Sequence, residues 1–400
     1  MTQGDASAAA QERRIVAAMF LAGAGVYVQT YDAQALLPLL AADQGVSATA
    51  SVLVLSATTV GMAVGVLPWA FLSDRLGRLR VIRMCLVAAT LVSLVSPLLP
   101  GFDVLLALRL VKGLLLGGVT GLAVAFLFER VRLARAVIAS GVYISGNTVG
   151  GVLTRVLSGI VADHWGWRVS LEVVAVLGVG FSAAFLLLTR RVPDAPVRRA
   201  PSDDGEGSLG LWQQIRANRV LLCFVQGFVA LGVFNALFSL LPFRLAAAHP
   251  ALGAVSTSAV LGLYAVAFAS AQSGGRLAAR FGVGLPLWTG HALALGGLGV
   301  LALGGLPALV VGVIAVVLGV FLVHPLNSAE SGRRVTQHRA QSTALYQISW
   351  LGGATVVGPV VSAVYERLGW HASLAALVLV SLGGVAAAAA DTAWRRSSLA

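Results

Sequence analysis

Several charged side chains lie inside long apolar segments of this sequence, where a charge is costly to bury. Asp32 interrupts the first apolar segment, and Arg109 and Lys112 interrupt a later one. A charge taken out of water is strongly disfavoured unless an opposite charge or hydrogen bonds compensate for it. We therefore predict a buried ion pair between Asp32 and Arg109. The alternative is that one or both side chains extend to the edge of the apolar region.

Lys112 is the only lysine in the chain, and it follows Arg109 by about one helical turn. The two side chains would then share one face of a helix. Two cations against a single acid leave a positive surplus, unless Lys112 is neutral or pairs elsewhere. A role in packing alone is an equal alternative for Lys112.

The composition places these charges in a membrane protein. Hydrophobic residues make up 58% of the 400 residues and charged residues 11%, with a mean hydropathy of +0.88. Soluble domains have about 45–50% apolar and about 25% charged residues. These values argue against a soluble enzyme, a nucleic-acid binder and a disordered scaffold. The net charge of +12 comes from short basic clusters between apolar segments, which fits a membrane surface better than nucleic acid.

Twelve segments are long and apolar enough to cross a bilayer, which takes about 20 residues per helix. They are continuously apolar, whereas the strands of a membrane barrel alternate. We therefore predict an all-α membrane protein with twelve transmembrane helices. The expected spans are residues 15–40, 50–71, 81–99, 104–127, 136–161, 168–188, 220–242, 254–273, 284–303, 306–328, 340–364 and 371–390.

The placement of arginines predicts the orientation, because basic residues accumulate in cytoplasmic loops. Only Arg168, Arg244 and Arg367 fall in the connections on one side. The other side has twenty-two arginines, in the ranges 13–14, 75–83, 130–135, 190–219, 276–280, 333–339 and 395–396. We expect both termini in the cytoplasm. The first apolar segment is expected to be a span rather than a cleaved signal peptide.

A proline-rich polar segment at 189–219 divides the chain into two expected six-helix halves. The predicted organisation is a cytoplasmic tail at 1–14, a bundle at 15–188, the cytoplasmic linker, a bundle at 220–390 and a tail at 391–400. The halves repeat, which indicates duplication of a six-helix unit. A shift of 203 residues aligns Tyr143 with Tyr346, Gly150 with Gly353 and Gly166 with Gly369, and a shift of 205 aligns Arg75 with Arg280 and Gly77 with Gly282.

The connection after the second expected span carries a family motif, AFLSDRLGRLR at 70–80. It resembles the signature loop of the major facilitator superfamily, G-x-L-x-D-R-x-G-R-R. The motif residues are Asp74, Arg75, Gly77 and Arg78, with Arg80 as a trailing base, and the sequence departs from the pattern at Ala70 and Leu79. A generic basic loop would explain the arginines but not Asp74. The resemblance implies two pseudo-symmetric halves and a cytoplasmic gate, in which Asp74 meets the start of the eleventh helix and the bases pair with Glu129.

Two further motifs extend the resemblance. The segment from Arg109 to Gly113 resembles the family's R-x-x-Q-G motif, whose arginine is associated with proton coupling, so Asp32 and Arg109 are the implied coupling pair. The segment YISGNTVGGVLTR at 143–155 is closest in wording to the bacterial YnfM-like group, within the twelve-helix drug:proton antiporter type. Small residues four apart favour close helix packing. The glycines with that spacing are Gly113, Gly117, Gly146 and Gly150.

Polar and aromatic residues inside the spans are the candidates for a substrate cavity. Such a mixture suits an amphiphilic or apolar solute, although each residue by itself is more typical of packing. The candidates are Gln29, Tyr31, Lys112, Tyr143, Asn147, Arg155, Phe234, Asn235, Phe238, Tyr346 and Trp350.

The favoured function is secondary active export of a small organic compound in exchange for protons. An alternative is proton-coupled transport of a metabolite such as a sugar, amino acid or organic anion, and a remote one is a receptor or scaffold. No P-loop, zinc motif or nucleophile elbow occurs, and Cys85 and Cys223 form no zinc or disulfide pattern. We therefore expect no enzyme, metal or cofactor, with the proton gradient as the energy source. The expected partners are protons, a small-molecule substrate and the lipid of the cell (inner) membrane, without nucleic acid, and the chain is expected to be a monomer.

Overall fold

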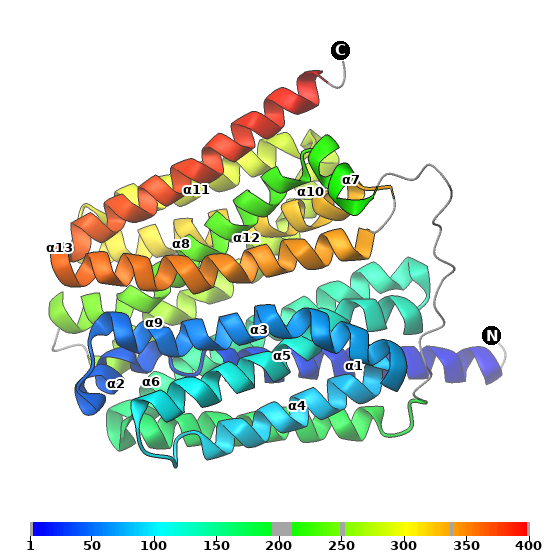
Figure 1. Ribbon diagram of the computed structural model, residues 1–400, viewed down its shortest axis with the longest axis horizontal. Helices are drawn as coiled ribbons and strands as arrows, with labels where there is room; N and C mark the ends of the chain where they lie inside the picture. Colours follow the sequence, from blue (N-terminus) through cyan, green and yellow to red (C-terminus); the bar gives the residue numbers. More distant parts are fainter. Residues whose placement is uncertain (1–2, 194–209, 249–252, 337–338, 398–400) are drawn as a thin grey trace. The chain divides into compact units, whose positions relative to one another are not determined.

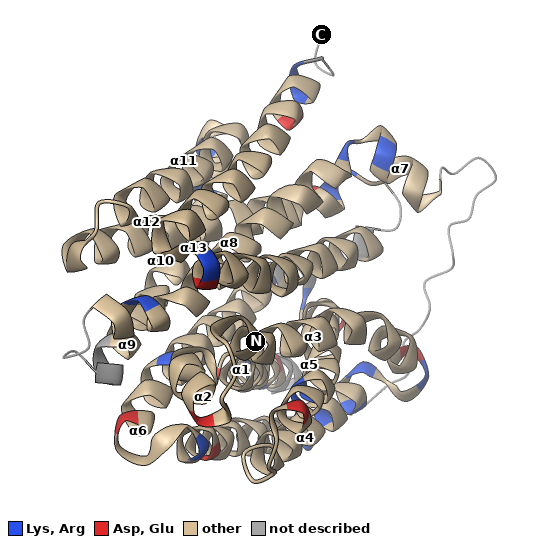
Figure 2. Cartoon of the chain, turned by 60° about the vertical axis from the view of Figure 1, so that its left-hand side comes forward, with Lys and Arg blue, Asp and Glu red and all other residues tan. Residues whose placement is uncertain are grey.

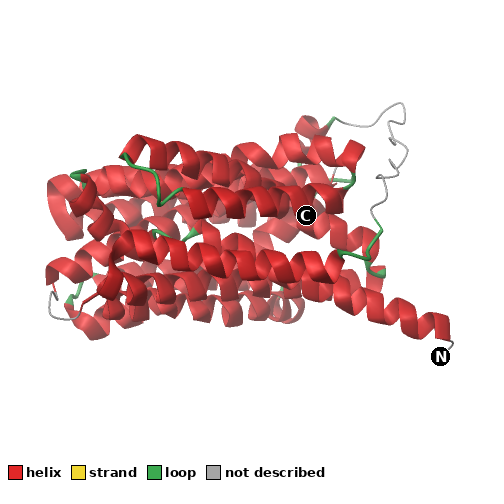
Figure 3. Ribbon diagram, turned by 90° about the horizontal axis from the view of Figure 1, so that it is seen from below, coloured by secondary structure: helices red, strands yellow, loops and turns green. Residues whose placement is uncertain are grey.

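The described part of the chain consists of helices and the short turns between them. The computed structural model describes residues 3–193, 210–248, 253–336 and 339–397, and this part contains no strand (Figures 1 and 3). The middle of the predicted linker, 194–209, lies outside the described residues. The helices are α1 (Gln3–Thr30), η1 (Gln34–Leu36), α2 (Leu37–Gln44), α3 (Ala48–Leu76), α4 (Arg78–Val95), α5 (Phe102–Arg130), α6 (Leu133–Thr189), α7 (Leu211–Ala217), α8 (Val220–Ala248), α9 (Gly253–Gly262), η3 (Leu263–Ala265), α10 (Val266–Phe281), α11 (Gly284–Leu301), α12 (Gly305–Arg333) and α13 (Arg339–Ser397).

Eight candidate spans in the described part are long and apolar enough to cross a membrane, and few of their residues are charged (Figure 2). Both α6, with 57 residues, and α13, with 59, contain two predicted spans, because Gly166 and Gly369 each interrupt the helix with a φ of 79°. A straight 57-residue helix would be about 85 Å long, against about 30 Å of bilayer core. The chain reverses at Gly166, since the Ser170 hydroxyl donates to the Ser158 carbonyl at 2.7 Å. The two remaining predicted spans correspond to α4 and to α9 with α10.

The first and eighth predicted spans are interrupted rather than continuous. After α1 ends at Thr30, the chain turns and resumes as η1 and α2, and Pro38 lies in the first turn of α2, where no backbone donor is needed. A short 3-10 helix, η3, separates α9 from α10. Residues 3–14, predicted as a tail, are the first turns of α1, and residues 391–397 continue α13.

The helices group into two compact units. The first comprises Met1–Val46, Ala57–Arg199 and His249–Gly262, and the second comprises Ser47–Ser56, Ala200–Ala248 and Leu263–Ala400. The units differ from the predicted halves in two short segments. The start of α3 belongs to the second unit, and α9, which packs against α6, belongs to the first.

The same backbone turns recur in both halves of the sequence, at glycines with a positive φ. Such a conformation is readily adopted only by glycine. The pairs are Gly77 and Gly282 with φ of 89° and 76°, Gly101 and Gly304 with 93° and 77°, and Gly166 and Gly369 with 79° each. The repeat seen in the sequence is therefore also a repeat of the backbone.

Glycines bring the helix backbones into contact within each unit. A Cβ added to any of the four predicted packing glycines would overlap a carbonyl of a neighbouring helix. The contacts are Gly146 with Phe20 and Gly150 with Ala24 between α6 and α1, and Gly113 with Thr58 and Gly117 with Met62 between α5 and α3. In the second unit, Gly353 of α13 lies against the Phe228 carbonyl of α8 in the same way.

Candidate functional site

The interruption of α1 places Asp32 against α5. Asp32 lies in the turn between α1 and η1, and Arg109 and Lys112 project from α5. The Arg109 guanidinium forms an ion pair with Oδ1 of Asp32, and Lys112 Nζ lies 2.8 Å from Oδ2. The three residues are 3%, 1% and 1% exposed, respectively. The structure thus brings the predicted coupling pair together and adds Lys112 to it.

Donors outnumber acceptors in this cluster. Both carboxylate oxygens of Asp32 are occupied, each by one cation. Arg109 Nε and Nη2 are buried and have no hydrogen-bond partner among the described residues. Lys112 therefore does not pair with a different acid: it contacts Asp32, as Arg109 does. The predicted surplus of positive charge remains, and the three side chains have a formal charge of +1.

Arg155 forms a second buried cationic site next to the first. Its Nε donates to the Gln34 side chain at 2.7 Å and its Nη1 to the Gly151 carbonyl at 2.8 Å. Its guanidinium lies 4.2 Å from the centre of the Tyr31 ring, within the range of a cation–π contact. Tyr31 and Gln34 flank Asp32 in the sequence, so the same turn positions both cationic sites.

Three of the predicted cavity residues lie at helix contacts within the first unit. The Gln29 side chain donates to the Gly25 carbonyl and accepts from the Ser93 hydroxyl of α4 at 2.9 Å. Asn147 and Tyr143 of α6 lie opposite Gly23 of α1, whose missing side chain makes room for them. These contacts favour packing for the three residues.

The predicted aromatic residues of the second unit belong to a larger cluster. The rings of Phe234 and Phe238 are 4.3 Å apart, and Phe234 also lies 5.5 Å from Tyr264 and 5.2 Å from Phe321. Phe321 lies 6.2 Å from Trp350. Tyr264 and Phe321 were not among the predicted residues. They come from η3 and α12, where nothing in the sequence distinguishes them from other apolar positions.

A polar group lies beside these aromatics. The Tyr346 hydroxyl donates to the His324 carbonyl at 3.1 Å and lies 3.0 Å from its Nδ1, while the Trp350 ring stacks on the imidazole at 3.7 Å. Asn235 donates to the Ala354 carbonyl at 3.1 Å, which joins α8 to α13. Asn235 therefore contributes to helix packing.

The predicted gate loop connects α3 to α4. Gly77 makes the turn with its φ of 89°, and Asp74 and Arg75 lie in the last turn of α3. Arg78 forms the predicted ion pair with Glu129 of α5, with an N–O distance of 3.2 Å. Arg75 and Arg80 are exposed. The gating roles of these residues stay predictions.

An ion cluster in the second unit was missed by the sequence analysis. Glu330 of α12 is 3% exposed and contacts Arg395 at 2.7 Å and Arg333 at 2.6 Å. Asp391, 2% exposed, contacts Arg334 at 2.7 Å. Glu330 lies 201 residues after Glu129, two residues short of the shorter repeat offset of 203, so the repeat alone did not identify it. Asp391 was missed because it lies in the predicted tail.

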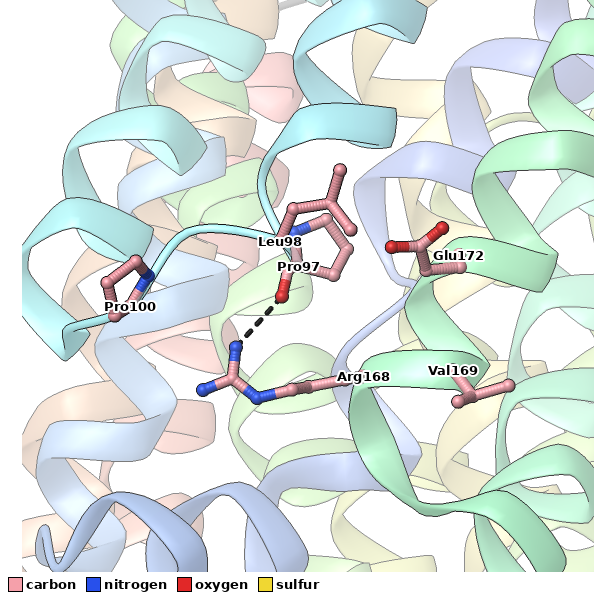
Figure 4. Close-up of a pocket in the computed structure, with 6 residues that line it drawn as sticks. All are labelled: Pro97, Leu98, Pro100, Arg168, Val169 and Glu172. Carbon is pink, nitrogen blue, oxygen red and sulfur yellow. Dashed lines mark hydrogen bonds between the residues drawn. The ribbon is translucent and has the colours of Figure 1, made fainter.

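A pocket opens at the loop between α4 and α5. It is lined by Pro97, Leu98, Pro100, Arg168, Val169 and Glu172 (Figure 4). Arg168 donates to the Pro97 carbonyl at 2.8 Å. None of the residues predicted to line a substrate cavity takes part in it.

The sequence and the fold of this chain are both similar to those of known membrane transporters. The family model of the Major Facilitator Superfamily matches residues 15–335. The chain is 29% identical to the inner membrane transport protein YnfM of Escherichia coli, over 93% of this chain and 89% of the relative. It is 27% identical to the uncharacterized MFS-type transporter YybF of Bacillus subtilis, over 90% and 88%. The fold matches the crystal structure of the nucleoside transporter NupG, with a TM-score of 0.73 at 13% identity, over 96% of this chain and 99% of that one.

Proposed function

Because the chain belongs to the Major Facilitator Superfamily, we propose that it exports a small organic compound in exchange for protons, with Asp32 as the group that carries the proton. The family and the relatives show that the chain is a multi-pass membrane protein and a secondary transporter of small molecules, not an enzyme. We further propose that the proton gradient is its energy source, that it acts as a monomer in the inner membrane, and that both termini lie in the cytoplasm.

The observation that carries the proposal is the buried Asp32 carboxylate held by Arg109 and Lys112. An ionisable group inside a membrane-spanning region is costly and typically marks a substrate or proton pathway. Protonation of Asp32 would remove the charge that both cations contact, so that Arg109 and Lys112 would be free to move. A proton taken up here can in this way alter the contact between α5 and the turn after α1.

In the antiport scheme, proton and substrate exclude each other at Asp32. Substrate entering from the cytoplasm displaces the proton, and a proton from outside resets the site after release. The ion pair of Arg78 with Glu129 at 3.2 Å supports a closing element on the cytoplasmic side, to which the predicted latch of Asp74 would add. The aromatic rings around Phe234 and Trp350 would suit the apolar part of a substrate.

The surplus of buried cations favours a second candidate, proton symport of an organic anion. Among the described residues, the first unit buries Arg109, Lys112 and Arg155 but, of the acids, only Asp32. An anion that replaced Asp32 on its two cations would leave that carboxylate uncompensated and favour its protonated form. Anion and proton would then bind together rather than exclude each other.

The direction of proton movement on ligand binding separates the two candidates. Ligands are first found by thermal shift of the purified protein across drugs, sugars, amino acids and carboxylates, since a ligand of the folded state raises its stability. Each hit is then added in weakly buffered detergent at neutral pH. Proton release supports antiport, and proton uptake supports symport.

The variant Asp32→Asn tests whether Asp32 carries the proton. The variant should bind ligand without exchanging protons and should lose accumulation driven by a pH gradient in proteoliposomes. Asp103→Asn is the control, because it removes an exposed acid outside the cluster that is not a coupling candidate. If Asp32→Asn exchanges as many protons as the wild type, Asp32 is not the coupling acid, and Glu129, Glu172 and His324 are the next candidates.

A further inference from the structure

The pocket between the α4–α5 loop and α6 lies where spans of the first unit end. The helix α4 ends at Val95, α5 begins at Phe102, and α6 reverses at Gly166. Arg168 of α6 donates a hydrogen bond to the Pro97 carbonyl of the α4–α5 loop at 2.8 Å. Span ends lie at the boundary between hydrocarbon and water, where tryptophan accumulates. Trp165, which is 65% exposed, and Trp167 flank the reversal, as expected for that depth.

The pocket presents two opposite charges that do not bind each other. Arg168 and Glu172 are one helical turn apart, a spacing at which two side chains on a helix are close enough to interact. Arg168 instead points to the loop and lies over the Trp167 ring at 4.4 Å. Glu172 has no ion-pair or hydrogen-bond partner among the described residues, and Figure 4 shows its carboxylate and the Arg168 guanidinium with no bond between them.

The surroundings of these charges are apolar and exposed. Pro97, Pro100, Leu98 and Val169 complete the lining, with Leu98 67% and Val169 44% exposed. One turn beyond Glu172, Val176 is 61% exposed on the outside of α6. A ligand that fits would combine a cationic and an anionic group close together with a long apolar part.

We propose that this pocket binds the headgroup of phosphatidylethanolamine. The phosphate accepts hydrogen bonds from the Arg168 guanidinium, whose planar donor set matches phosphate oxygens. The ammonium, two carbons away, donates to the Glu172 carboxylate one helical turn further along α6. The acyl chains lie on the exposed side chains of Leu98, Val169 and Val176. This lipid site is separate from the proposed transport site and does not depend on it.

The headgroup chemistry gives a sharp comparison between lipids. Phosphatidylcholine has the same phosphate and charge, but its quaternary ammonium has no N–H to donate to Glu172. Phosphatidylglycerol retains the phosphate and has no cation. With matched acyl chains, the protein should bind phosphatidylethanolamine about tenfold more tightly than phosphatidylcholine, because a hydrogen bond to a charged group is lost.

The test titrates the three lipids into delipidated, detergent-purified full-length protein and measures binding by native mass spectrometry. Glu172→Gln should reduce the preference for phosphatidylethanolamine over phosphatidylcholine several-fold, because the amide oxygen still accepts the ammonium N–H but without the charge of the carboxylate. Arg168→Gln should weaken the binding of all three lipids. Asp103→Asn is the matched control, because this exposed acid in the first turn of α5 lies outside the pocket lining.

Two outcomes would overturn the lipid proposal. The first is an unchanged preference for phosphatidylethanolamine in Glu172→Gln. The second is an equal loss of that preference in Asp103→Asn, which would indicate a general surface effect. Thermal unfolding of each variant without lipid shows whether it is folded. Because binding is measured without a proton gradient, a failure of the transport proposal would leave these results unaffected.

Discussion

The charge balance around Asp32 makes a quantitative prediction about stability. In the wild type, Asp32 faces Arg109 and Lys112, and the three side chains together have a formal charge of +1. Asp32→Asn leaves two buried cations and no acid, a charge of +2. Lys112→Met leaves the Asp32–Arg109 pair alone, with no net charge, and replaces lysine by an apolar side chain of similar length. The two variants should therefore have opposite consequences.

Removal of one partner of a buried ion pair typically costs about 3–5 kcal/mol, whereas replacement of a buried charge by an apolar group of similar volume is often neutral. Asp32→Asn should accordingly lower the free energy of unfolding by about 3–5 kcal/mol. Lys112→Met should change it by less than about 1 kcal/mol. In the double variant only one uncompensated cation remains, so the loss should be smaller than for Asp32→Asn alone.

The assay is reversible unfolding in mixed micelles, with the four proteins of the double-mutant cycle compared under one condition. The coupling energy between the two positions should exceed about 0.5 kcal/mol, as expected for residues in direct contact. Asp103→Asn serves as the control for the loss of an exposed acid. The reasoning is refuted if Lys112→Met is as destabilising as Asp32→Asn, or if the two effects add without coupling.

Three further predictions concern the gate, the packing and the topology. Asp74→Asn should reduce transport at least tenfold with little change in expression, and transport at the wild-type rate would contradict the latch. Gly150→Leu should lower the melting temperature more than Gly141→Leu on the same helix. The reason is that a Cβ at Gly150 overlaps the Ala24 carbonyl, whereas Gly141 faces open space. Equal shifts of the melting temperature would contradict close packing of α1 and α6. In intact cells, a cysteine at the exposed Asp103 should react with impermeant reagents and one at Arg216 should not, and the reverse pattern would invert the topology.

The parts of the molecule that follow from composition could be predicted from the sequence. The spans follow from apolar length, and the ion pair of Asp32 with Arg109 follows from the cost of an isolated buried charge. The repeat in the sequence aligned Gly77 and Gly166 with their counterparts, and the structure adds that each pair makes the same turn with a positive φ. These features depend on local residue type rather than on three-dimensional detail.

The contacts that depend on an interrupted helix were not predicted. Because α1 ends at Thr30, the chain turns and the Tyr31 ring lies against the Arg155 guanidinium. The same turn brings Asp32 into contact with Lys112 as well as with Arg109, its predicted partner. An apolar segment gives no signal for such a turn. In the same way, Asp391 appears in the sequence as part of a polar end, although α13 continues through it and buries it against Arg334.

The duplicated halves differ at the positions where the first one buries Asp32, Arg109, Lys112 and Arg155. Gly150 contacts Ala24 of α1, and its counterpart Gly353 contacts Phe228 of α8 in the same way. Ala24 and Phe228 are 204 residues apart. The same offset makes Ala236 the counterpart of Asp32. For α5 and α12, the offset is 201 residues between Glu129 and Glu330 and 203 residues between Gly101 and Gly304. These offsets place the counterparts of Arg109 and Lys112 within Val310–Ala315, where every residue is uncharged. Arg155 corresponds to Gly358.

Among the described residues, the four buried charges of the first unit therefore have uncharged counterparts, although the backbone glycines are shared. The joint loss is expected for the acid and its cations, because a half that kept the cations without the acid would bury uncompensated charge, which costs several kcal/mol. The second half keeps the scaffold and has aromatic rings on α8, α12 and α13 instead. This difference between the units supports the proposal that the first unit couples transport to protons and the second contacts the apolar part of the substrate. A substitution at Asp32 should therefore affect coupling, and one at Phe234 should affect substrate affinity.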